Sequence, residues 1–454
     1  MLRRCYGTFT GGIDLPDQKS ATLNRSITPA PRPSRLLVPL GPCGGPTAKP
    51  LVAPGQAVEA GQMLARAAGG DAMDVFAPLA GKVASLDAVA AVAGPYGFLA
   101  NAAIELTDLG ECPAPASPAT HENWIDCPTD ALMQQLRQGG LTTHRRPVEP
   151  LATWLNKAAA TRCDVLIANA VEGQPYVTAD HRLLTEHGAD VVAGLVILAR
   201  VLGITKVLLA VDYRRTGSYQ SLAQAAHSWD VATIALPHKY PIGADAVLVH
   251  LLARRQVPPG GTATDVAAAV IDPASCCAVF RWIVYKQRAT HRVVTVAGEQ
   301  AGRHENFWTP LGYPCAELAR RTAPSEAGAA RAPSASVVEP IIHGGPMVGL
   351  RCHAMAVVTP ATNALLAIDE APQASPTTCI RCGWCTDHCP ARLNVAILND
   401  DFELSRVNHA CRLRVAACVE CGVCSYVCPA RLPLTERVKQ LKQAAARPLP
   451  VEGT

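Results

Sequence analysis

Two short cysteine-rich runs near the C-terminus carry the clearest chemistry in this sequence. The first reads CIRCGWCTDHCP from Cys379 to Pro390, and the second reads CVECGVCSYVCP from Cys418 to Pro429. Both follow one pattern, in which three cysteines at two-residue gaps precede a fourth cysteine and a proline. A cube-shaped 4Fe–4S cluster needs four thiolates around it, so each run indicates one cluster.

A tight loop of three cysteines wraps three corners of a cluster, and the fourth ligand must come from elsewhere. In ferredoxins with two clusters, the fourth cysteine of each run binds the cluster of the other run. The predicted ligands are Cys379, Cys382, Cys385 and Cys428 for cluster 1, and Cys418, Cys421, Cys424 and Cys389 for cluster 2. Two structural zinc sites are the alternative, but they leave the third and fourth cysteines of each run unexplained.

The chain between the runs, residues 391–417, reads as helical, which favours a helical two-cluster ferredoxin domain over 371–446. Such a module transfers single electrons and has no substrate pocket, so we predict no catalytic residue in it. Trp384 and Tyr426 lie inside the runs and are predicted to shield the clusters from water. The preceding chain must supply or dock an electron donor or acceptor.

The composition indicates a well-packed protein of several domains. Its 454 residues exceed what one core fills, and apolar residues make up 49% against 17% charged. A scattered net charge of +4 does not indicate a nucleic-acid partner. The longest apolar stretch, 191–211, is broken by Arg200, Gly203 and Lys206, so it reads as a helix and a strand rather than a membrane span.

The other cysteines show no shared spacing, and no secretory signal is expected at MLRRCYGTFTGGIDLP. These ten cysteines are Cys5, Cys43, Cys112, Cys127, Cys163, Cys276, Cys277, Cys315, Cys352 and Cys411. Metal-bound thiolates in a reducing compartment therefore account for the cysteine content better than disulfides do. Any membrane association is expected to be peripheral, through a partner.

Changes of pattern along the chain predict a multidomain protein with α/β and β parts. The predicted units are a barrel-sandwich domain at 1–115, an α/β domain at 120–290, a small β-rich module at 291–320, a linker and connecting segment at 321–370, and the ferredoxin domain at 371–446. The α/β prediction rests on alternating strands and helices between 163 and 256, which favour a parallel sheet covered by helices.

Residues 36–108 alternate short apolar runs with Gly/Pro turns, and the stretch resembles the barrel-sandwich of lipoyl and biotinyl domains. Those domains carry a modifiable lysine at a hairpin tip. Here the tip is Asp71–Asp74, and the nearest lysine, Lys82, lies in the next turn. We therefore expect a rigid docking module rather than a carrier of a covalent cofactor.

The order of these parts resembles the C subunit of the Rnf electron-transport complex (RnfC) from about residue 11 to residue 446. The motifs that carry the resemblance are GGIDLP at 11–16, DCPTDALMQQLRQGG at 126–140, KYPIGADAVLVHLLARRQVPPGG at 239–261, RVVTVAGE at 292–299 and GGPMVG at 344–349. The resemblance implies a middle domain like the complex I flavoprotein subunit, followed by a β-grasp (SLBB) module at about 291–318.

The resemblance also implies a peripheral subunit on the cytoplasmic face of the bacterial inner membrane. Its partners would be the membrane-embedded and peripheral subunits of an Rnf-like translocase, with ferredoxin and NADH as electron carriers. Two 4Fe–4S clusters and FMN are the implied cofactors. Of the family's FMN/NADH stretch, ANAVEGQPYVTADHRLL at 168–184 keeps Asn169, Glu172 and Tyr176, while Gln174 replaces a glutamate.

The same region departs from the family where FMN would bind. GGLTTHRRPVEPL at 139–151 lacks the family's glycine-rich loop, and Asp272 stands in place of an asparagine-containing stretch. A loop without side chains allows backbone to approach phosphate and flavin closely, which makes FMN doubtful here. Either Arg145 and Arg146 hold a nucleotide by charge, or the fold remains as a scaffold. Glu172 is either a ligand or a cap of the strand–helix turn.

Three functions are therefore open. In the first, the chain is an NADH-side subunit of an ion-translocating oxidoreductase with an altered flavin site. In the second, it is a flavin-free cluster relay that docks another protein. In the third, it is an assembly subunit whose clusters only stabilise the C-terminal domain. The eight intact cysteines argue against the third. Bound flavin distinguishes the first two.

Overall fold

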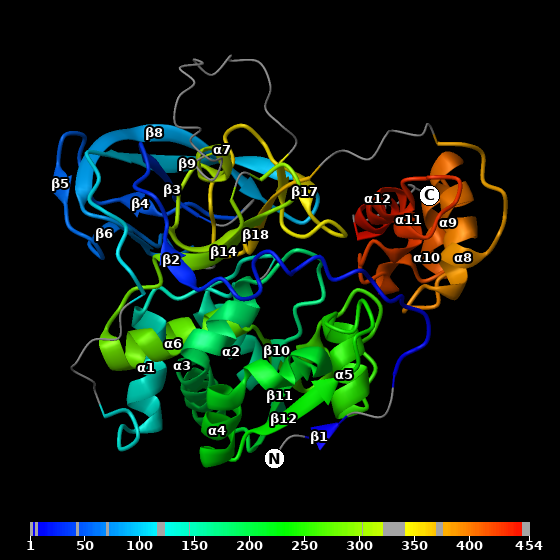
Figure 1. Ribbon diagram of the computed structural model, residues 1–454, viewed down its shortest axis with the longest axis horizontal. Coiled ribbons are helices and arrows are strands. Elements are labelled where there is room, and N and C mark those ends of the chain that lie inside the picture. The colour runs from blue at the N-terminus through cyan, green and yellow to red at the C-terminus, as the bar shows by residue number, and fades with distance from the viewer. Residues whose placement is uncertain are drawn as a thin grey trace, which may run out of the picture.

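The structure is a computed structural model of the chain. It describes residues 3–4, 8–41, 45–69, 72–115, 123–144, 146–301, 303–320, 341–368 and 376–446. Figure 1 shows the α/β domain below, two β-rich units above it, and a helical C-terminal unit to one side. Within the described residues, no helix is both long and apolar enough to cross a membrane.

The α/β domain is built on a five-stranded parallel sheet of order β1-β12-β11-β10-β13. Its strands are β1 (Arg3–Arg4), β10 (Val165–Ala170), β11 (Lys206–Asp212), β12 (Ala232–Leu236) and β13 (Ala268–Ile271). Its helices are α1 (Thr129–Gln138), α2 (Leu151–Ala160), α3 (Ala179–Leu202), α4 (Gln220–Ser228), α5 (Asp245–Ala253) and α6 (Pro273–Tyr285), with 3-10 turns at Tyr213–Ser218 and Ala263–Val266. The predicted parallel α/β sheet is confirmed.

Alternate residues of the central strand β10 enter two different cores, which is why residues 165–168 are all apolar. Val165 and Ile167 pack in the core under α5, whereas Leu166 and Ala168 pack in the larger core with α1, α2, α3 and α6. Helix α3 ends at Gly203, whose φ of 68° favours glycine, as the sequence predicts. It begins at Ala179, where the carboxylate of Glu172 accepts from its first amides.

The first β-rich unit carries the long hairpin expected of the N-terminal domain. One sheet has the order β3-β9-β8-β5 and the other β4-β6-β7. The strands are β3 (Leu36–Pro39), β4 (Lys49–Pro50), β5 (Ala57–Val58), β6 (Met63–Arg66), β7 (Val75–Phe76), β8 (Gly81–Ala93) and β9 (Phe98–Thr107). Asp71 of the predicted hairpin tip lies outside the described residues.

The second β-rich unit is larger than the predicted module at 291–320. Its six-stranded mixed sheet has the order β17-β16-β18-β14-β15-β2. The strands are β2 (Ile27–Pro29), β14 (His291–Ala297), β15 (Glu305–Pro310), β16 (Ile341–His343), β17 (Leu350–Arg351) and β18 (Ala364–Ala367), and helix α7 (Cys315–Arg320) follows β15 in the chain. The part of the connecting segment from 341 to 367 thus supplies three strands, whereas 321–340 lies outside the described residues.

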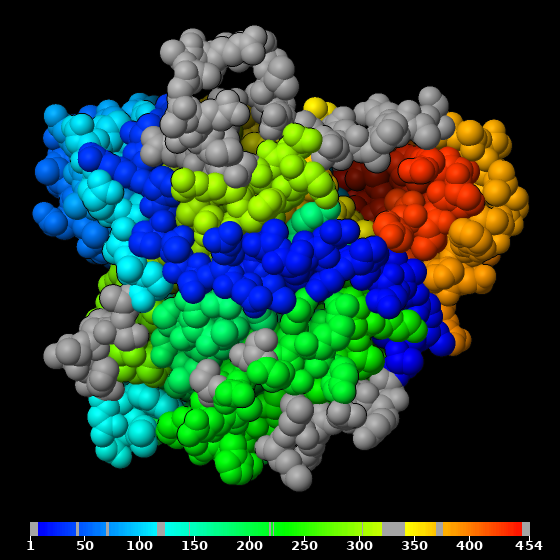
Figure 2. All heavy atoms as spheres, in the orientation of Figure 1, coloured from blue at the N-terminus to red at the C-terminus, as the bar shows by residue number. Residues whose placement is uncertain are grey.

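The described residues 8–30 of the predicted N-terminal domain contribute no strand to the two sheets of the barrel-like unit. Residues 8–30 form a strap that Figure 2 shows as a dark blue band across the molecule. One end contacts the C-terminal helical unit, where the amide of Gly12 donates to the carbonyl of His388 at 2.8 Å. The other end pairs as β2 with β15. Extended Gly- and Pro-containing chain can follow three different surfaces without forming a core of its own.

Candidate functional site

The two cysteine runs adopt the same backbone conformation. The C-terminal unit contains helices α8 (Trp384–Asp387), α9 (Val395–Glu403), α10 (Val407–Arg412), α11 (Val423–Tyr426) and α12 (Leu434–Ala446), and a 3-10 turn at Val415–Ala417. Gly383 and Gly422 have φ values of 82° and 85° and begin α8 and α11. Both positions need glycine, because a side chain rarely tolerates this conformation. The sequence repeat is therefore a structural repeat.

The thiols of Cys382, Cys428 and Cys379 lie near that of Cys385. All eight cysteines are free thiols. Burial raises the pKa of Cys385, and the nearby thiols of Cys382, Cys428 and Cys379 act in the same direction. The group thus joins three cysteines of the first run to the last cysteine of the second.

The second set has the reverse composition, with three cysteines of the second run and the last cysteine of the first run. Burial raises the pKa of Cys421 to about 12, and the neighbouring thiols are those of Cys418, Cys424 and Cys389. These four side chains line one cavity of about 360 Å³ together with apolar residues of α9 and α12. Within the described residues, no three His, Cys, Asp or Glu side chains are arranged to hold a single metal ion. The second set of thiols thus faces an apolar cavity.

The two sets differ in their access to solvent. Cys382 of the first set is exposed, whereas Cys418, Cys421 and Cys424 are partly buried. Trp384 and Tyr426 are 53% and 56% exposed. About half of each side chain is thus covered by protein, and the shielding of the clusters by these two aromatic residues stays a prediction.

The second cysteine run is docked on the α/β domain by a chain of hydrogen bonds. The amide of Gln174 donates to the hydroxyl of Tyr240 at 2.8 Å, and this hydroxyl donates to the carbonyl of Cys421 at 2.6 Å. The side-chain carbonyl of Gln174 accepts from the backbone amide of Met347 at 3.1 Å. Gln174 thus connects the β10–α3 loop, the GGPMVG segment and a cysteine of the second run.

Close backbone packing completes this contact. A Cβ added at Gly422 would lie 2.2 Å from the carbonyl oxygen of Met347, and one at Gly11 would lie 2.7 Å from that of Cys389. Leu15, Tyr240 and Val423 form a small buried core beneath them. The second set of thiols is consequently held against both the α/β domain and the N-terminal strap.

The three residues carried over for FMN or NADH are occupied by internal contacts. Asn169 donates to the carbonyl of Gly243 at 2.8 Å. Tyr176 donates a hydrogen bond to Glu299 of the six-stranded sheet. Glu172 accepts from the amides of Asp180 and His181 at 2.9 and 3.3 Å, which satisfies donors at the start of α3. The cap interpretation of Glu172 is confirmed.

Glu172 also forms a buried ion pair with Lys19 of the strap. The Nζ atom of Lys19 lies 3.7 Å from the Glu172 carboxylate, and both side chains are almost fully buried. Burial raises the pKa of Glu172, which the positive charge of Lys19 opposes. Burial likewise lowers the pKa of Lys19, against the attraction of Glu172.

We expect Glu172→Ala to destabilise the chain by about 3–5 kcal/mol, because it leaves a buried ammonium without its partner. Urea unfolding followed by tryptophan fluorescence measures this loss. The double variant Lys19→Met/Glu172→Met removes both charges and should lose less than Glu172→Ala alone. Equal losses in the two variants would contradict the buried pair.

The chain around the missing glycine-rich loop is closed by side-chain packing. An added Cβ at Gly139 would lie 2.7 Å from Trp282, and one at Gly140 would lie 2.4 Å from Phe76. The amide of His144 donates to Ser275 Oγ at 2.9 Å. Ser275 Oγ in turn donates to Asp272 Oδ2 at 2.7 Å. The backbone amide of His144 therefore already donates to a partner within the protein and is not available to a phosphate.

Asp272 has a structural role at the start of α6. Its carboxylate accepts from the amide of Ser275 at 2.8 Å and thereby caps the helix. Burial opposes its charge, yet His144, Ser275 and Arg292 together lower its pKa. Burial lowers the pKa of His144, so the imidazole is neutral at pH 7.

Arg146 does not lie on a solvated loop. Its side chain is half-buried and donates to the carbonyl of Val348 at 3.4 Å. Burial lowers its pKa, and Glu420 of the second cysteine run opposes this effect. Arg145 lies outside the described residues. Arg146 therefore serves the contact between the loop, the GGPMVG segment and the C-terminal unit.

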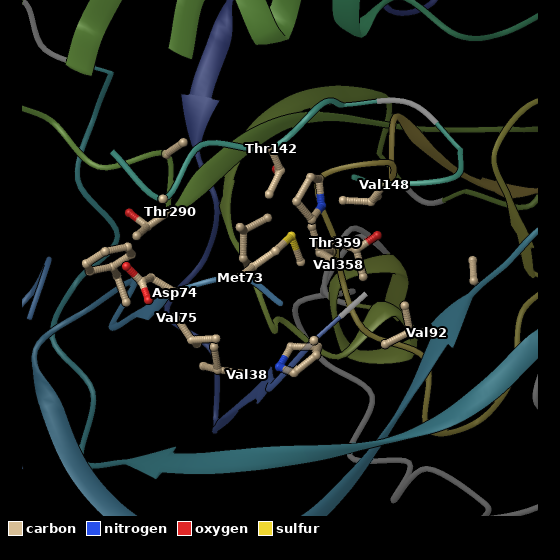
Figure 3. A pocket seen from close by; sticks show the side chains of 18 of the residues that line it. Val38, Met73, Asp74, Val75, Val92, Thr142, Val148, Thr290, Val358 and Thr359 are labelled. Carbon is tan, nitrogen blue, oxygen red and sulfur yellow. The ribbon is translucent and has the colours of Figure 1, made fainter. Parts of the chain in front are cut away.

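The large cavity in Figure 3 lies elsewhere. It has a volume of about 870 Å³ and is mostly apolar, between the barrel-like unit, the loop after α1 and the six-stranded sheet. Met73 and Asp74 of the predicted hairpin tip face Thr142 and Val358 across it. None of the three residues carried over for FMN or NADH lines this cavity. The hairpin tip thus docks against the α/β domain, as expected of a rigid module.

Sequence reasoning missed the residues that join the domains. Lys19, Tyr240 and Met347 lie in the GGIDLP-to-β2 strap and in the KYPIGA and GGPMVG motifs, which served only as marks of resemblance. Their immediate neighbours in sequence, such as Gln18 and Ser20 beside Lys19, give no local signal of burial. Its partner could not be read, because the contacts span between 153 and 181 positions in sequence.

Comparisons with known proteins agree with this architecture. The RnfC barrel sandwich hybrid domain matches residues 7–105, and the Nuo51 FMN-binding domain matches residues 149–281. The C subunit of the ion-translocating oxidoreductase complex of Edwardsiella ictaluri is 31% identical over 391 residues, which are 85% of this chain and 47% of that protein. The chain therefore spans about half the length of this relative.

A second relative is covered more fully. The C subunit of the proton-translocating ferredoxin:NAD(+) oxidoreductase complex of Clostridium ljungdahlii is 27% identical over 398 residues, 86% of this chain and 84% of that protein. Among solved structures, an NAD+-reducing hydrogenase in its H2-reduced state matches 71% of this chain and 64% of its own, with a TM-score of 0.46 and 17% identity.

A barrel-sandwich domain followed by a Nuo51-type domain defines the class to which this chain belongs. Within that class, the chain is similar over 85% of its length to C subunits of ion-translocating oxidoreductase complexes, and residues 7–105 match the RnfC barrel sandwich hybrid domain. The predicted barrel-sandwich and flavoprotein-like domains are thereby confirmed, while the SLBB and ferredoxin modules stay predictions.

Proposed function

We propose that this chain is an electron-transfer subunit of a membrane-bound, ion-translocating oxidoreductase complex linked to ferredoxin and NADH. It passes electrons through two 4Fe–4S clusters, and it contributes to the enzyme as a subunit rather than through a catalytic residue of its own. The single observation that carries this proposal is the crosswise gathering of eight free thiols into two groups of four.

The thiols fit two clusters. Cys379, Cys382, Cys385 and Cys428 would hold cluster 1, and Cys418, Cys421, Cys424 and Cys389 would hold cluster 2. Each cluster, when bound, supplies a centre that accepts and donates one electron. Because burial raises the pKa of the ligand thiols, cluster binding must displace their protons and contributes to the stability of the helical unit.

The surroundings of the two groups suggest an inner and an outer cluster. Cluster 2 would lie against the α/β domain, where Tyr240 holds the backbone of Cys421. Cluster 1 would lie beside solvent-exposed Ile380, Trp384 and Tyr426. Electrons would thus pass between a protein-covered centre and one that a partner can approach.

A flavin-free relay is the second candidate, and the fate of the predicted flavin residues favours it. Asn169, Glu172 and Tyr176 are all held in internal contacts, and His144 and Asp272 close the place of the glycine-rich loop. These residues do not fit FMN, so we derive no step through flavin or through NADH oxidation by this chain.

The partners would be the membrane-embedded and peripheral subunits of an Rnf-like complex. The chain itself would sit peripherally on the cytoplasmic face of the inner membrane. The first statement rests on the names of the relatives, which describe subunits of ion- or proton-translocating complexes, and the second rests on the family resemblance of the sequence.

The iron and flavin contents of the anaerobically purified chain test this function. We expect about eight irons per chain from two 4Fe–4S clusters, with no stoichiometric FMN. Iron is measured by a chelator assay, and flavin by fluorescence after denaturation of the same sample. About one FMN per eight irons would overturn the flavin-free relay, and fewer than about four irons would overturn the two-cluster proposal.

A further inference from the structure

A second buried cavity lies between α3, α6 and the six-stranded sheet, apart from the thiols. Its volume is about 450 Å³. The polar residues that line it are Arg281, Arg288, Arg292, His144, His291 and Gln287. The remaining lining is apolar or a thiol, and it includes no carboxylate. Its lining charges are therefore all positive.

Two nitrogen atoms in this lining have no hydrogen-bond partner. They are the buried atoms Arg292 Nε and His291 Nε2, on a buried arginine and a partly buried histidine. His291 Nδ1 lies 3.1 Å from the Thr290 hydroxyl, and in the tautomer in which Nδ1 accepts from this hydroxyl the ring proton is on Nε2. A buried donor without an acceptor costs free energy, so both atoms favour a ligand that accepts hydrogen bonds.

Neighbouring groups hold the cationic side chains in place. His291 stacks on Trp308 with ring centres 5.7 Å apart and planes inclined by 5°. The Arg281 guanidinium lies 5.3 Å from the centre of the Trp308 ring. Arg292 donates to the carbonyl of His144 at 3.2 Å and also to that of Pro360. The donors are thus fixed before any ligand arrives.

Carboxylates outside the cavity lining act on these charges. Asp180, Asp272 and Glu172 oppose the burial that lowers the pKa of Arg292. Asp190 lies 3.9 Å from Arg281, and burial raises the pKa of Asp190. Burial lowers the pKa of His291 to about 3, with Arg281 acting in the same direction. An anion beside His291 would act against both of these causes.

We propose that the cavity bounded by Arg281, His291 and Arg292 binds a small tetrahedral oxyanion of the phosphate class. Such an anion offers several acceptor oxygens to fixed donors, which a water molecule cannot match. It would tie α6 to β14 and to the loop at His144, where three parts of the fold meet. This inference does not depend on the proposed electron transfer.

Equilibrium dialysis with radiolabelled inorganic phosphate tests the site on the full chain carrying its clusters, at pH 7.5 and constant ionic strength. We expect about one phosphate per chain. His291→Phe keeps the stacking on Trp308 but removes the Nε2 donor, and should weaken binding at least tenfold. Ala278→Leu fills the cavity from α6 without touching a polar group, and should also abolish binding.

His227→Phe, on the exposed face of α4, is the matched control and should bind phosphate like the unmodified chain. Absence of binding at millimolar phosphate would overturn the proposal, as would undiminished binding by both cavity variants. Competition by AMP would assign the site to a phosphate ester, and indifference to AMP would assign it to the free anion.

Discussion

Cys389→Ser should abolish cluster 2 and leave cluster 1 in place, although Cys389 belongs to the first cysteine run. The reason is the crosswise arrangement, in which the neighbours of Cys389 are thiols of the second run. The iron content should fall from about eight to about four per chain. Electron paramagnetic resonance of the reduced protein should lose the interaction between two clusters and keep the signal of one.

Cys428→Ser is the matched variant with the opposite result. Its thiol lies beside Cys385, so cluster 1 should be lost and cluster 2 kept. The double variant Cys382→Ser/Cys428→Ser should retain about four irons, because both residues serve one cluster. The pair Cys382→Ser/Cys389→Ser should retain almost none. Equal iron in the two double variants would contradict the crosswise ligand sets.

Exposed Cys411 offers a negative control within the same domain. It lies at the end of α10, outside both groups of thiols, and is solvent-exposed. Cys411→Ser should keep about eight irons and both signals. Iron loss in this variant would show that the domain is sensitive to any cysteine substitution, and the two run variants would then carry no information on ligation.

Local patterns predicted most of the elements that surround the candidate site. The repeat of glycines 383 and 422 and the alternation of strands β10 to β12 with helices follow from short-range rules, because turn conformation and burial act on neighbouring residues. Helix α3 is capped at its start by Glu172, from a loop whose role the sequence leaves open between ligand and cap.

Contacts between residues far apart in the chain could not be predicted from the sequence. Residues 341–367 read as a connection because each strand is short, and only pairing with β14 makes them part of a sheet. The docking of Tyr240 on Cys421 joins residues 181 positions apart. Neither contact produces a periodic pattern in the sequence. Each contact depends on how two folded units pack together rather than on the local folding of either unit.

The missing glycine-rich loop shows what the absence of a motif can predict about a site. Its absence correctly drew attention to residues 139–151 and Asp272. It could not reveal that His144, Ser275 and Asp272 close the gap, because a histidine among prolines and arginines carries no such pattern. The sequence likewise could not reveal the proximity of Arg146 to Glu420, since Glu420 comes from the other end of the chain.

The chain should lose stability steeply as the pH falls from about 6.5 to about 4. Burial is the first cause that lowers the pKa of five histidines: His181 and His187 to about 4, His291 and His343 to about 3, and His144 in the same direction. In the unfolded chain the same groups titrate near about 6.5. Within this window the unfolded state therefore binds more protons, and the free energy of unfolding falls with the pH.

Each such group contributes about 1.4 kcal/mol per pH unit within its window, so together they outweigh most single substitutions. Urea unfolding followed by tryptophan fluorescence at several pH values gives the slope, with iron assayed at each pH to confirm that the clusters are retained. His343→Asn should reduce the slope by about one proton, because the buried imidazole no longer titrates on unfolding. The exposed control His227→Asn should leave the slope unchanged, and a stability that is flat between pH 7 and 5 would contradict the neutral burial of these side chains.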